Sequence, residues 1–407
     1  MDARQAAELA ARTSYGRLVA YLAASWRDVA RAEDALGDAL VAALETWPQS
    51  GVPEKPEAWL LSVARRRLID GARHASVAAA TTDALRIVVE RAQEEASMDV
   101  QFPDERLKLL FVCAHPAIDE GIRTPLMLQT VLGLDAAAIA SAFLVSPATM
   151  GQRLVRAKTK IRDAGIHFDL PEAHELPERV EAVLEAIYAV YGTSWDDVAG
   201  ADARRRGLAE EAIYLGRLVV GLLPDEPEAG GLLALMLHCE ARRPARRDAD
   251  GRYVPLTDQD VARWSTPLLK EAEQILHAAS RPNRPGRFQL EAAIQSVHAA
   301  RAATGRTDWD AIALLYEGLL RCAPTIGAHV GHAAALAETR GAAAGLRALD
   351  AMPAAVSAYQ PYWALRAHLL RAVGRGDDAR DAYGRAIGLT EDGAARAFLV
   401  AQAAAVR

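Results

Sequence analysis

The sequence is poor in cysteine, in aromatic residues and in long apolar runs, and each shortage argues against a class of protein. Its three cysteines, Cys113, Cys239 and Cys322, lie far apart in 407 residues, so they form neither a disulfide framework nor the paired spacing of a zinc site. Aromatic residues make up only 6%, and β-branched runs are few, which makes an all-β protein unfavourable. The longest apolar run, 136–145, is interrupted by Ser141 and is too short to cross a bilayer.

The chain also lacks a net basic charge and an export signal. Residues 1–170 hold 20 Lys and Arg against 22 Asp and Glu, and residues 171–407 hold 27 against 31. Nucleic-acid binding would therefore depend on local basic faces. The N-terminus has no basic flank followed by an apolar core, as a signal peptide would. We expect a reduced, soluble, cytoplasmic protein with no membrane partner.

Alanine is very abundant, and apolar residues recur at helical spacing along most of the chain. Because alanine is the best helix former, the sequence predicts an all-α fold. Proline-rich or mixed stretches divide it. The predicted organisation is a helical domain at 1–75, a linker at 76–103, a second helical domain at 104–168, a helical connecting domain at 171–300 and helical repeats at 301–407.

The repeats after residue 300 rest on a weak internal period. Tyr316, Leu349 and Tyr383 are spaced by 33 and 34 residues, and each lies in a patterned helical segment. A period near 34 built from helix pairs is typical of tetratricopeptide (TPR) repeats. The alternative is an irregular array of helical hairpins.

The strongest motif is a helix-turn-helix between Ala136 and Lys160. Helices are predicted over 135–143 and 147–163, with Ser146 as N-cap and Pro147 in the first helical position. The second helix would present polar and basic side chains, as a helix that enters a DNA major groove does. These are Thr149, Gln152, Arg153, Arg156 and Lys160, with Arg156, Lys158, Lys160 and Arg162 suited to phosphates. The alternative is an amphipathic helix pair with a solvated basic face.

A second basic cluster lies on the predicted helix that begins at Pro56. It comprises Arg65, Arg66, Arg67 and Arg73, with Trp59 nearby. Alone, such a cluster is more often a solvated surface than a binding site. Beside a helix-turn-helix it becomes a candidate second DNA contact.

Three segments resemble the extracytoplasmic-function sigma factors of bacteria. They are AEDALGDALVAALETW at 32–47, PEAWLLSVARRRLIDGAR at 56–73 and SPATMGQRLVRAKTKIRDAG at 146–165. The first two are similar to region 2 of that family and the third to region 4. Segments such as LKLLFVCAHPAI at 107–118 and RVEAVLEAIYAVY at 179–191 resemble the subgroup with a long, TPR-like C-terminal extension.

The resemblance implies a transcription initiation factor that binds core RNA polymerase, mainly through the clamp helices of its β′ subunit, and promoter DNA. Matched by position, the polymerase contacts would be Glu33, Asp34 and Asp38. The contacts to the minus-10 element would be Trp59, Arg65, Arg66 and Arg73, and the loop 49–55 would capture a flipped base. The contacts to the minus-35 element would be Thr149, Gln152, Arg153 and Arg156, with Lys158 and Lys160 on phosphates.

Four positions depart from the family pattern. Gly37 and Leu40 stand where glutamine and phenylalanine are usual, Arg66 replaces an asparagine, and Gly151 replaces a frequently basic residue. These changes leave the fold intact. They bear on the strength of polymerase binding and on the promoter sequence.

No catalytic set, cofactor site or metal site is predicted, because the chain has no glycine-rich phosphate loop and its histidines are scattered over apolar helical faces. We expect the C-terminal half to regulate the sigma half in cis and to bind a protein or peptide. The sequence does not indicate whether this regulation activates or inhibits. One alternative is a TPR-type interaction regulator whose sigma half is degenerate and no longer initiates transcription. Another is a helical enzyme, for which no site residues are present.

Overall fold

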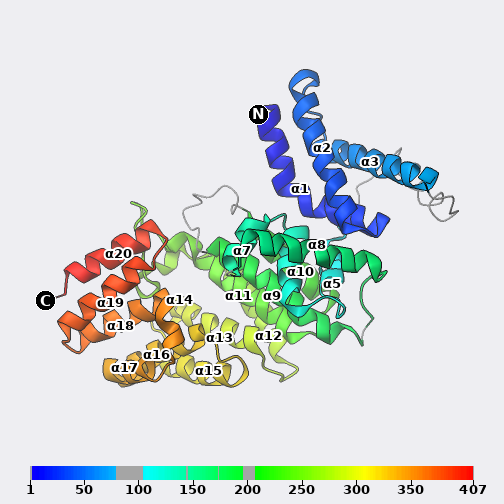
Figure 1. Ribbon diagram of the computed structural model, residues 1–407. Helices are drawn as coiled ribbons and strands as arrows, with labels where there is room; N and C mark the ends of the chain where they lie inside the picture. Colours follow the sequence, from blue (N-terminus) through cyan, green and yellow to red (C-terminus); the bar gives the residue numbers. More distant parts are fainter. Residues whose placement is uncertain (1, 79–103, 144, 173, 196–206, 407) are drawn as a thin grey trace. The chain divides into compact units, whose positions relative to one another are not determined.

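The computed structural model describes residues 2–78, 104–143, 145–172, 174–195 and 207–406 (Figure 1). Within these ranges every regular element is a helix, apart from one isolated antiparallel bridge between Arg247 and Tyr253. The predicted all-α fold class is therefore confirmed. The chain divides into two compact units, Met1–Ala189 and Val190–Arg407, which are described one at a time.

The first unit begins with three long helices that pack on one another. The core between them contains Leu22, Leu36, Trp47 and Leu60, each at most 1% exposed. Glu57, in the first turn of the third helix, accepts hydrogen bonds from Ser14 and Arg17 of the first helix and so holds the two together. The helices are α1 (Ala3–Trp26), α2 (Val29–Ser50) and α3 (Pro56–Ala78).

The prolines at positions 48, 53 and 56 predict that this helix ends at Trp47-Pro48 and that a loop covers 49–56. That prediction is wrong at the helix end, because α2 continues through Pro48 to Ser50. A proline in the last turn removes only one backbone hydrogen bond, and its fixed φ is close to the helical value. The helix therefore tolerates proline at this position. The helix ends at Gly51, whose φ of +86° favours glycine and whose N–H donates to the Trp47 carbonyl at 3.0 Å.

The second set of helices in this unit packs against α1 around an apolar helix, α5. Leu109, Leu110, Phe111 and Cys113 of α5 are at most 1% exposed. The predicted linker lies almost entirely outside the described residues, since 79–103 are not among them. The helices are α5 (Arg106–Cys113), α6 (Glu120–Thr130), α7 (Ala136–Ala142), α8 (Pro147–Asp163) and the first part of α9 (Leu176–Trp195).

The second unit is built around α11, which is buried along almost its whole length. A Cβ at Gly231 would collide with the backbone of Gln289, so this glycine lets α13 approach α11 closely. Glu228, in the first turn of α11, accepts the Phe288 N–H at 2.8 Å and the Gln289 N–H at 3.1 Å, and so caps α13. The helices here are α10 (Leu208–Leu222), α11 (Pro227–Arg242), α12 (Thr266–Ser280), α13 (Arg287–Ala299) and α14 (Arg301–Thr304).

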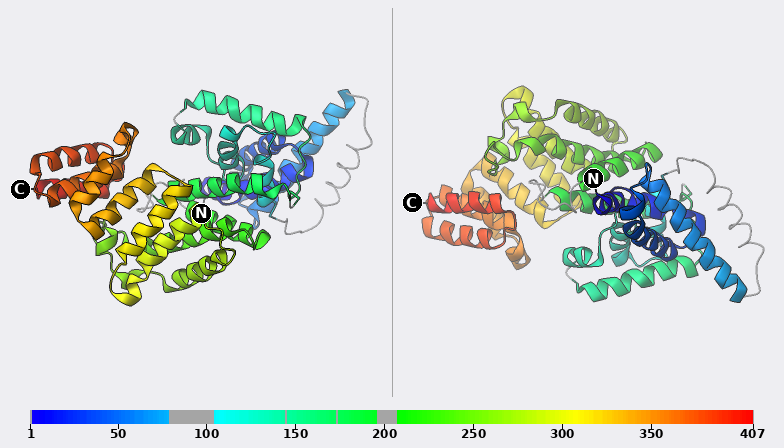
Figure 2. Two further views of the ribbon diagram at one scale, coloured as in Figure 1. Left: turned by 90° about the horizontal axis from the view of Figure 1, so that it is seen from below. Right: turned by 90° about the horizontal axis from the view of Figure 1, so that it is seen from above.

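The C-terminal part of the second unit consists of three successive helical hairpins, and α18, α19 and α20 lie side by side at its end (Figures 1 and 2). Tyr316, Leu349 and Tyr383, which carry the sequence period, each lie in the first helix of a hairpin. Leu349 and Tyr383 are at most 2% exposed, as residues in the core of stacked helical hairpins would be. The hairpins are α15 (Trp309–Cys322) with α16 (Ile326–Arg340), α17 (Ala342–Asp350) with α18 (Gln360–Ala372), and α19 (Gly376–Gly388) with α20 (Gly393–Ala404).

A long loop between α11 and α12 holds the last hairpin. Arg247 of this loop forms an ion pair with Asp392 at the start of α20. The ring of Tyr253 packs edge-to-face on Phe398, with 5.4 Å between the ring centroids. The loop contains three short 3-10 helices, η1 (Arg243–Ala245), η2 (Leu256–Asp258) and η3 (Val261–Arg263), and a fourth, η4 (Ala354–Ala358), follows α17.

His238 of α11 is fully buried, and neither of its ring nitrogens has a hydrogen-bond partner in the described structure. Its Nε2 lies 3.6 Å from an oxygen of the half-exposed Glu273. Burial, with a contribution from Arg242, lowers the pKa of His238 to about 4. The folded second unit therefore contains a neutral imidazole near pH 6.

This burial makes the second unit sensitive to acid. Between pH 6.5 and pH 4 the unfolded chain protonates His238 while the folded chain does not, so the free energy of unfolding falls as the pH falls through that window. The free energy of unfolding should fall less between pH 7 and pH 4.5 in His238→Gln than in the parent protein. We expect a difference of about 2–3 kcal/mol, measured by denaturant titration. The control is the exposed His277→Gln. An equal pH dependence in both variants would contradict the expectation.

Candidate nucleic-acid interface

Helices α7 and α8 form the helix-turn-helix, with the bounds that the sequence predicted to within one residue. Ser146 caps α8 by accepting the Thr149 N–H at 3.2 Å, and Pro147 occupies the first helical position. The Val145 N–H donates to the Ala140 carbonyl at 3.1 Å, which closes the turn. The predicted cap and the predicted start of α8 are confirmed.

The inner and outer faces of α8 are well separated. Met150, Leu154, Ala157 and Ile161 are at most 5% exposed and pack inward. The predicted minus-35 residues that lie on the outer face are exposed: Gln152, Arg153, Arg156 and Lys160. Thr149 is half-buried, and its hydroxyl lies 2.8 Å from that of Ser146. It therefore contributes to the cap of the helix.

Lys158 does not share the outer face. It lies four residues after Leu154, on the buried side of α8, and only 9% of it is exposed. Its ammonium group donates to the carboxylate of Glu33 on α2. In this structure Lys158 is therefore unavailable to a phosphate, and its DNA contact stays a prediction that requires this ion pair to break.

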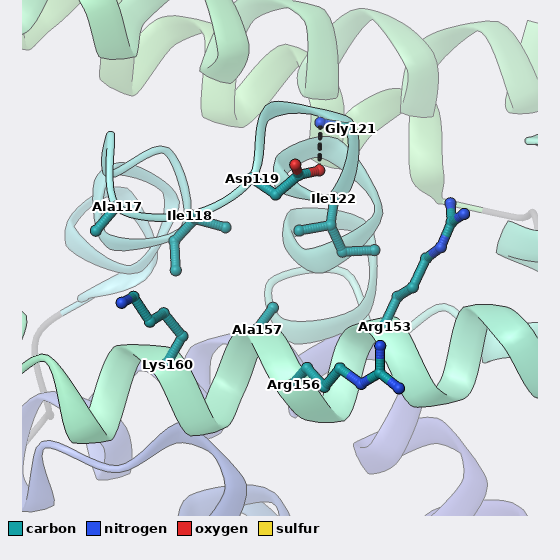
Figure 3. Close-up of a pocket in the computed structure, with 9 residues that line it drawn as sticks. All are labelled: Ala117, Ile118, Asp119, Gly121, Ile122, Arg153, Arg156, Ala157 and Lys160. Carbon is teal, nitrogen blue, oxygen red and sulfur yellow. Dashed lines mark hydrogen bonds between the residues drawn. The ribbon is translucent and has the colours of Figure 1, made fainter.

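A cavity of about 580 Å³ opens beside the outer face of α8 (Figure 3). Arg153, Arg156 and Lys160 line one side, and Ile118 and Ile122 line the other. Asp119 also lines the cavity, and it caps α6 by accepting the Gly121 N–H at 3.1 Å. The basic side chains thus border an open, largely apolar hollow that contains one carboxylate. The sequence pattern did not reveal this hollow, because its walls come from segments about 35 residues apart.

The second basic face, on α3, is only partly exposed. Arg66 and Arg67 are exposed, and Arg67 lies 3.9 Å from Asp38. Arg65 is 8% exposed; it donates to the Tyr21 hydroxyl, and its guanidinium lies 5.0 Å from the centre of that ring. Arg65 thus supports the packing of α3 on α1.

The other predicted minus-10 residues lie on the same helix. The half-buried ring of Trp59 packs edge-to-face on that of Trp47, with 5.4 Å between the ring centroids. Arg73 belongs to α3, but its side chain is outside the described residues. The structure therefore places Trp59 and Arg66 together on α3 and leaves the side chain of Arg73 undescribed.

The predicted polymerase contacts separate into two kinds. Asp34 and Asp38 are exposed on α2, but the Glu33 side chain is only 13% exposed and pairs with Lys158. Burial raises the pKa of Glu33, and Lys158 opposes that rise. Burial, together with the charge of Glu33, also raises the pKa of Tyr15.

Two of the departures from the family pattern lie in open space. A Cβ added at Gly37 or at Gly151 would meet no atom within 4 Å. Neither glycine is therefore required by packing. Arg66 is exposed and Leu40 is half-buried.

No group of three or more His, Cys, Asp or Glu side chains in the described part of the chain is arranged to hold a metal ion. Over the same residues, no helix combines the length and apolarity that a bilayer span requires.

The comparisons with known proteins place the chain in a family. Residues 12–77 match the family model of sigma-70 region 2, and residues 179–280 match a family of unknown function, DUF6596. A protein of Rhizobium meliloti (strain 1021), named only as uncharacterized, is 38% identical over 378 residues, which are 92% of this chain and 89% of that protein. No solved structure matches.

The sigma-70 match covers most of α1 and all but the last residue of α3, so it coincides with the helices described above. The chain belongs to the ECF-like sigma factors that carry a C-terminal extension. Its region 2 gives it a sigma-factor role in transcription initiation, which involves core RNA polymerase and promoter DNA.

The exposed face of α8 can be tested by comparing two basic residues. We expect Arg153→Ala to weaken binding mainly at one base pair of the minus-35 element, because a bidentate arginine–guanine pair is worth about 1–3 kcal/mol of discrimination. We expect Lys160→Ala to weaken binding to every sequence and to reduce the salt slope by about 1. Titrations with the cognate promoter and single-base variants measure both. Uniform losses for Arg153→Ala would assign that residue to a phosphate.

Proposed function

We propose that this sigma factor recognises promoters at two elements, with α3 at the minus-10 element and α8 at the minus-35 element. The observation that carries the proposal is the helix-turn-helix of α7 and α8, which exposes Gln152, Arg153, Arg156 and Lys160 in the same unit as region 2. Run-off transcription with core polymerase is the test. Failure to initiate from any promoter would favour the alternative, a degenerate sigma half in an interaction regulator.

A stripe along the exposed side of α2 supports polymerase binding. Asp34 and Asp38 lie on it, followed by Val41 and Leu44, which are 55% and 46% exposed. These positions recur at helical spacing, so they share one side of α2. Exposed aliphatic groups next to acidic ones are suited to a protein partner, here the clamp helices of the β′ subunit.

We expect Asp34→Lys with Asp38→Lys to abolish capture of core polymerase by a folded protein. Both side chains are exposed, so their replacement should cost less than about 0.5 kcal/mol of stability. The matched control is Glu8→Lys with Asp169→Lys, which changes the charge equally at exposed positions elsewhere in the unit. Pull-down of core polymerase measures the effect. Undiminished capture by the α2 variant would remove this assignment.

We further propose that the C-terminal half, residues 171–407, regulates the sigma half in cis through TPR-like repeats. Stacked helical hairpins form extended surfaces that bind proteins or peptides. The net charge of this half is −4, so it is not expected to add DNA affinity. A module on the same chain acts at high effective concentration, up to millimolar for short linkers. Such a factor would act in the cytoplasm, with RNA polymerase.

Two truncations test regulation in cis. One ends after Leu170 and removes α9; the other ends after Trp195 and keeps it, because the division between the two units falls inside this helix. We expect both truncated proteins to differ from the full chain in core binding and in run-off transcription, in the same direction. Activity equal to that of the full chain, under conditions where the full chain is active and where it is silent, would contradict the proposal.

A further inference from the structure

The second unit contains a cavity of about 280 Å³ between α12 and α13. Both helices rest on α11, at two neighbouring glycines. A Cβ at Gly230 would lie 2.9 Å from the Cβ of Ala279 on α12, and a Cβ at Gly231 would lie 2.5 Å from the backbone nitrogen of Gln289 on α13. Each glycine therefore lets one of the two helices approach α11 closely, and the cavity remains between them.

One end of the cavity carries the carboxylate of Glu273, on α12. Its Oε1 accepts the Ser296 hydroxyl of α13 at 2.6 Å and lies 3.6 Å from Nε2 of the buried His238. Its Oε2 accepts no hydrogen bond from a described residue, and no described lysine or arginine pairs with this carboxylate. Since His238 is neutral near pH 7, the charge of Glu273 is not compensated by a neighbouring cation.

The other end of the cavity carries the amide of Gln289, a residue that is only 6% exposed. Its Nε2 donates to Oε1 of Glu228 at 3.1 Å and to the Arg284 carbonyl at 2.8 Å, which uses both amide hydrogens. These two acceptors assign the orientation of the amide, so the remaining atom is Oε1, an acceptor. Among the described residues, this Oε1 has no donor.

Between its two ends the cavity is mainly apolar, and none of the residues that line it is a lysine or an arginine. The apolar lining residues are Leu276, Pro285, Leu290 and Ala293. The hydroxyl of Ser280, which also lines the cavity, donates to the backbone carbonyl of His277 at 2.8 Å. The open polar atoms at the two ends are therefore acceptors, and a ligand must bring donors to them.

The charges nearby also favour a cationic ligand. Glu228, which holds the amide of Gln289, forms no ion pair with a lysine or arginine in the part of the chain that the structure describes. The cations of the following loop have other partners: Arg284 donates to the Asp225 carbonyl, and Arg287 pairs with Glu291. A carboxylate thus lies at or near each end of the cavity, and positive charge at both ends of a ligand would be attracted.

We infer that the cavity between α12 and α13 binds an aliphatic diamine, doubly protonated, with one ammonium group at each end. Ser296, which holds Glu273, lies seven residues after Gln289 on α13, or about 10 Å along the helix. A chain of five carbons spans ~7.5 Å between its nitrogens at ordinary bond lengths. Angled hydrogen bonds of about 2.9 Å to Glu273 and Gln289 cover the rest. The methylene groups pack on the apolar walls, and every residue involved lies in the second unit, apart from the promoter contacts proposed above.

Calorimetric titration of the full-length protein with cadaverine, the five-carbon diamine, tests the site at pH 7 and constant ionic strength. We expect one cadaverine per chain. Pentylamine, which has a single ammonium group and resembles a lysine side chain, should bind at least tenfold more weakly, and the uncharged pentanediol should bind more weakly still. Equal affinity for pentylamine would overturn the diamine in favour of a lysine side chain. Equal affinity for pentanediol, or no binding of cadaverine, would overturn the cationic ligand.

Two variants place the cadaverine in this cavity. Glu273→Gln removes the charge of a half-exposed side chain and keeps its shape, and Ala293→Leu fills the cavity without a change of charge. We expect each to lower the affinity for cadaverine at least tenfold, while thermal melting without ligand shows that the variant is folded. The matched control is Glu391→Gln, which removes a charge from an exposed position elsewhere in the second unit and should bind as the parent does. Undiminished affinity in Glu273→Gln, or an equal loss in Glu391→Gln, would overturn the site.

Discussion

The backbone contact of α1 with the segment after α6 is the constraint on which the first unit depends. It requires glycine at position 16, because any side chain there would meet the Val131 carbonyl. Once the two backbones touch, α5 is enclosed, and the polar groups of Glu33 and Lys158 must pair because little water reaches them. Glycine at this one position thus allows the two sets of helices to approach closely, beside the buried pair of Glu33 and Lys158.

The packing of the first unit also decides which charged side chains of α8 and α2 stay exposed. Five basic residues lie between 146 and 165, yet the packing of α8 takes Lys158 inward and leaves Arg153, Arg156 and Lys160 beside an open hollow. On α2 the same packing takes Glu33 inward and leaves Asp34 and Asp38 exposed. The faces that remain accessible are those suited to a nucleic acid and to a protein. Promoter DNA and core RNA polymerase are the partners that we propose for these two faces.

Local signals in the sequence predicted the all-α fold and the start of α8, because Ser146 and Pro147 act within a few residues. The same kind of signal was wrong at Pro48, where tertiary packing of Trp47 keeps the last turn helical. Lys158 was assigned by its charge, although its spacing of four from Leu154 already indicates the buried side. Its partner on α2 could not be foreseen, because a contact between positions 33 and 158 leaves no local pattern.

The cap on α13 has a consequence for how the second unit assembles. The backbone N–H groups of Phe288 and Gln289 are satisfied by Glu228, a side chain of α11. Neither α13 nor its docking against Gly231 is complete without α11, so the two helices should gain and lose protection as one cooperative segment. Because α11 precedes α13 in the chain, it leaves the ribosome first and can serve as the template on which α13 forms.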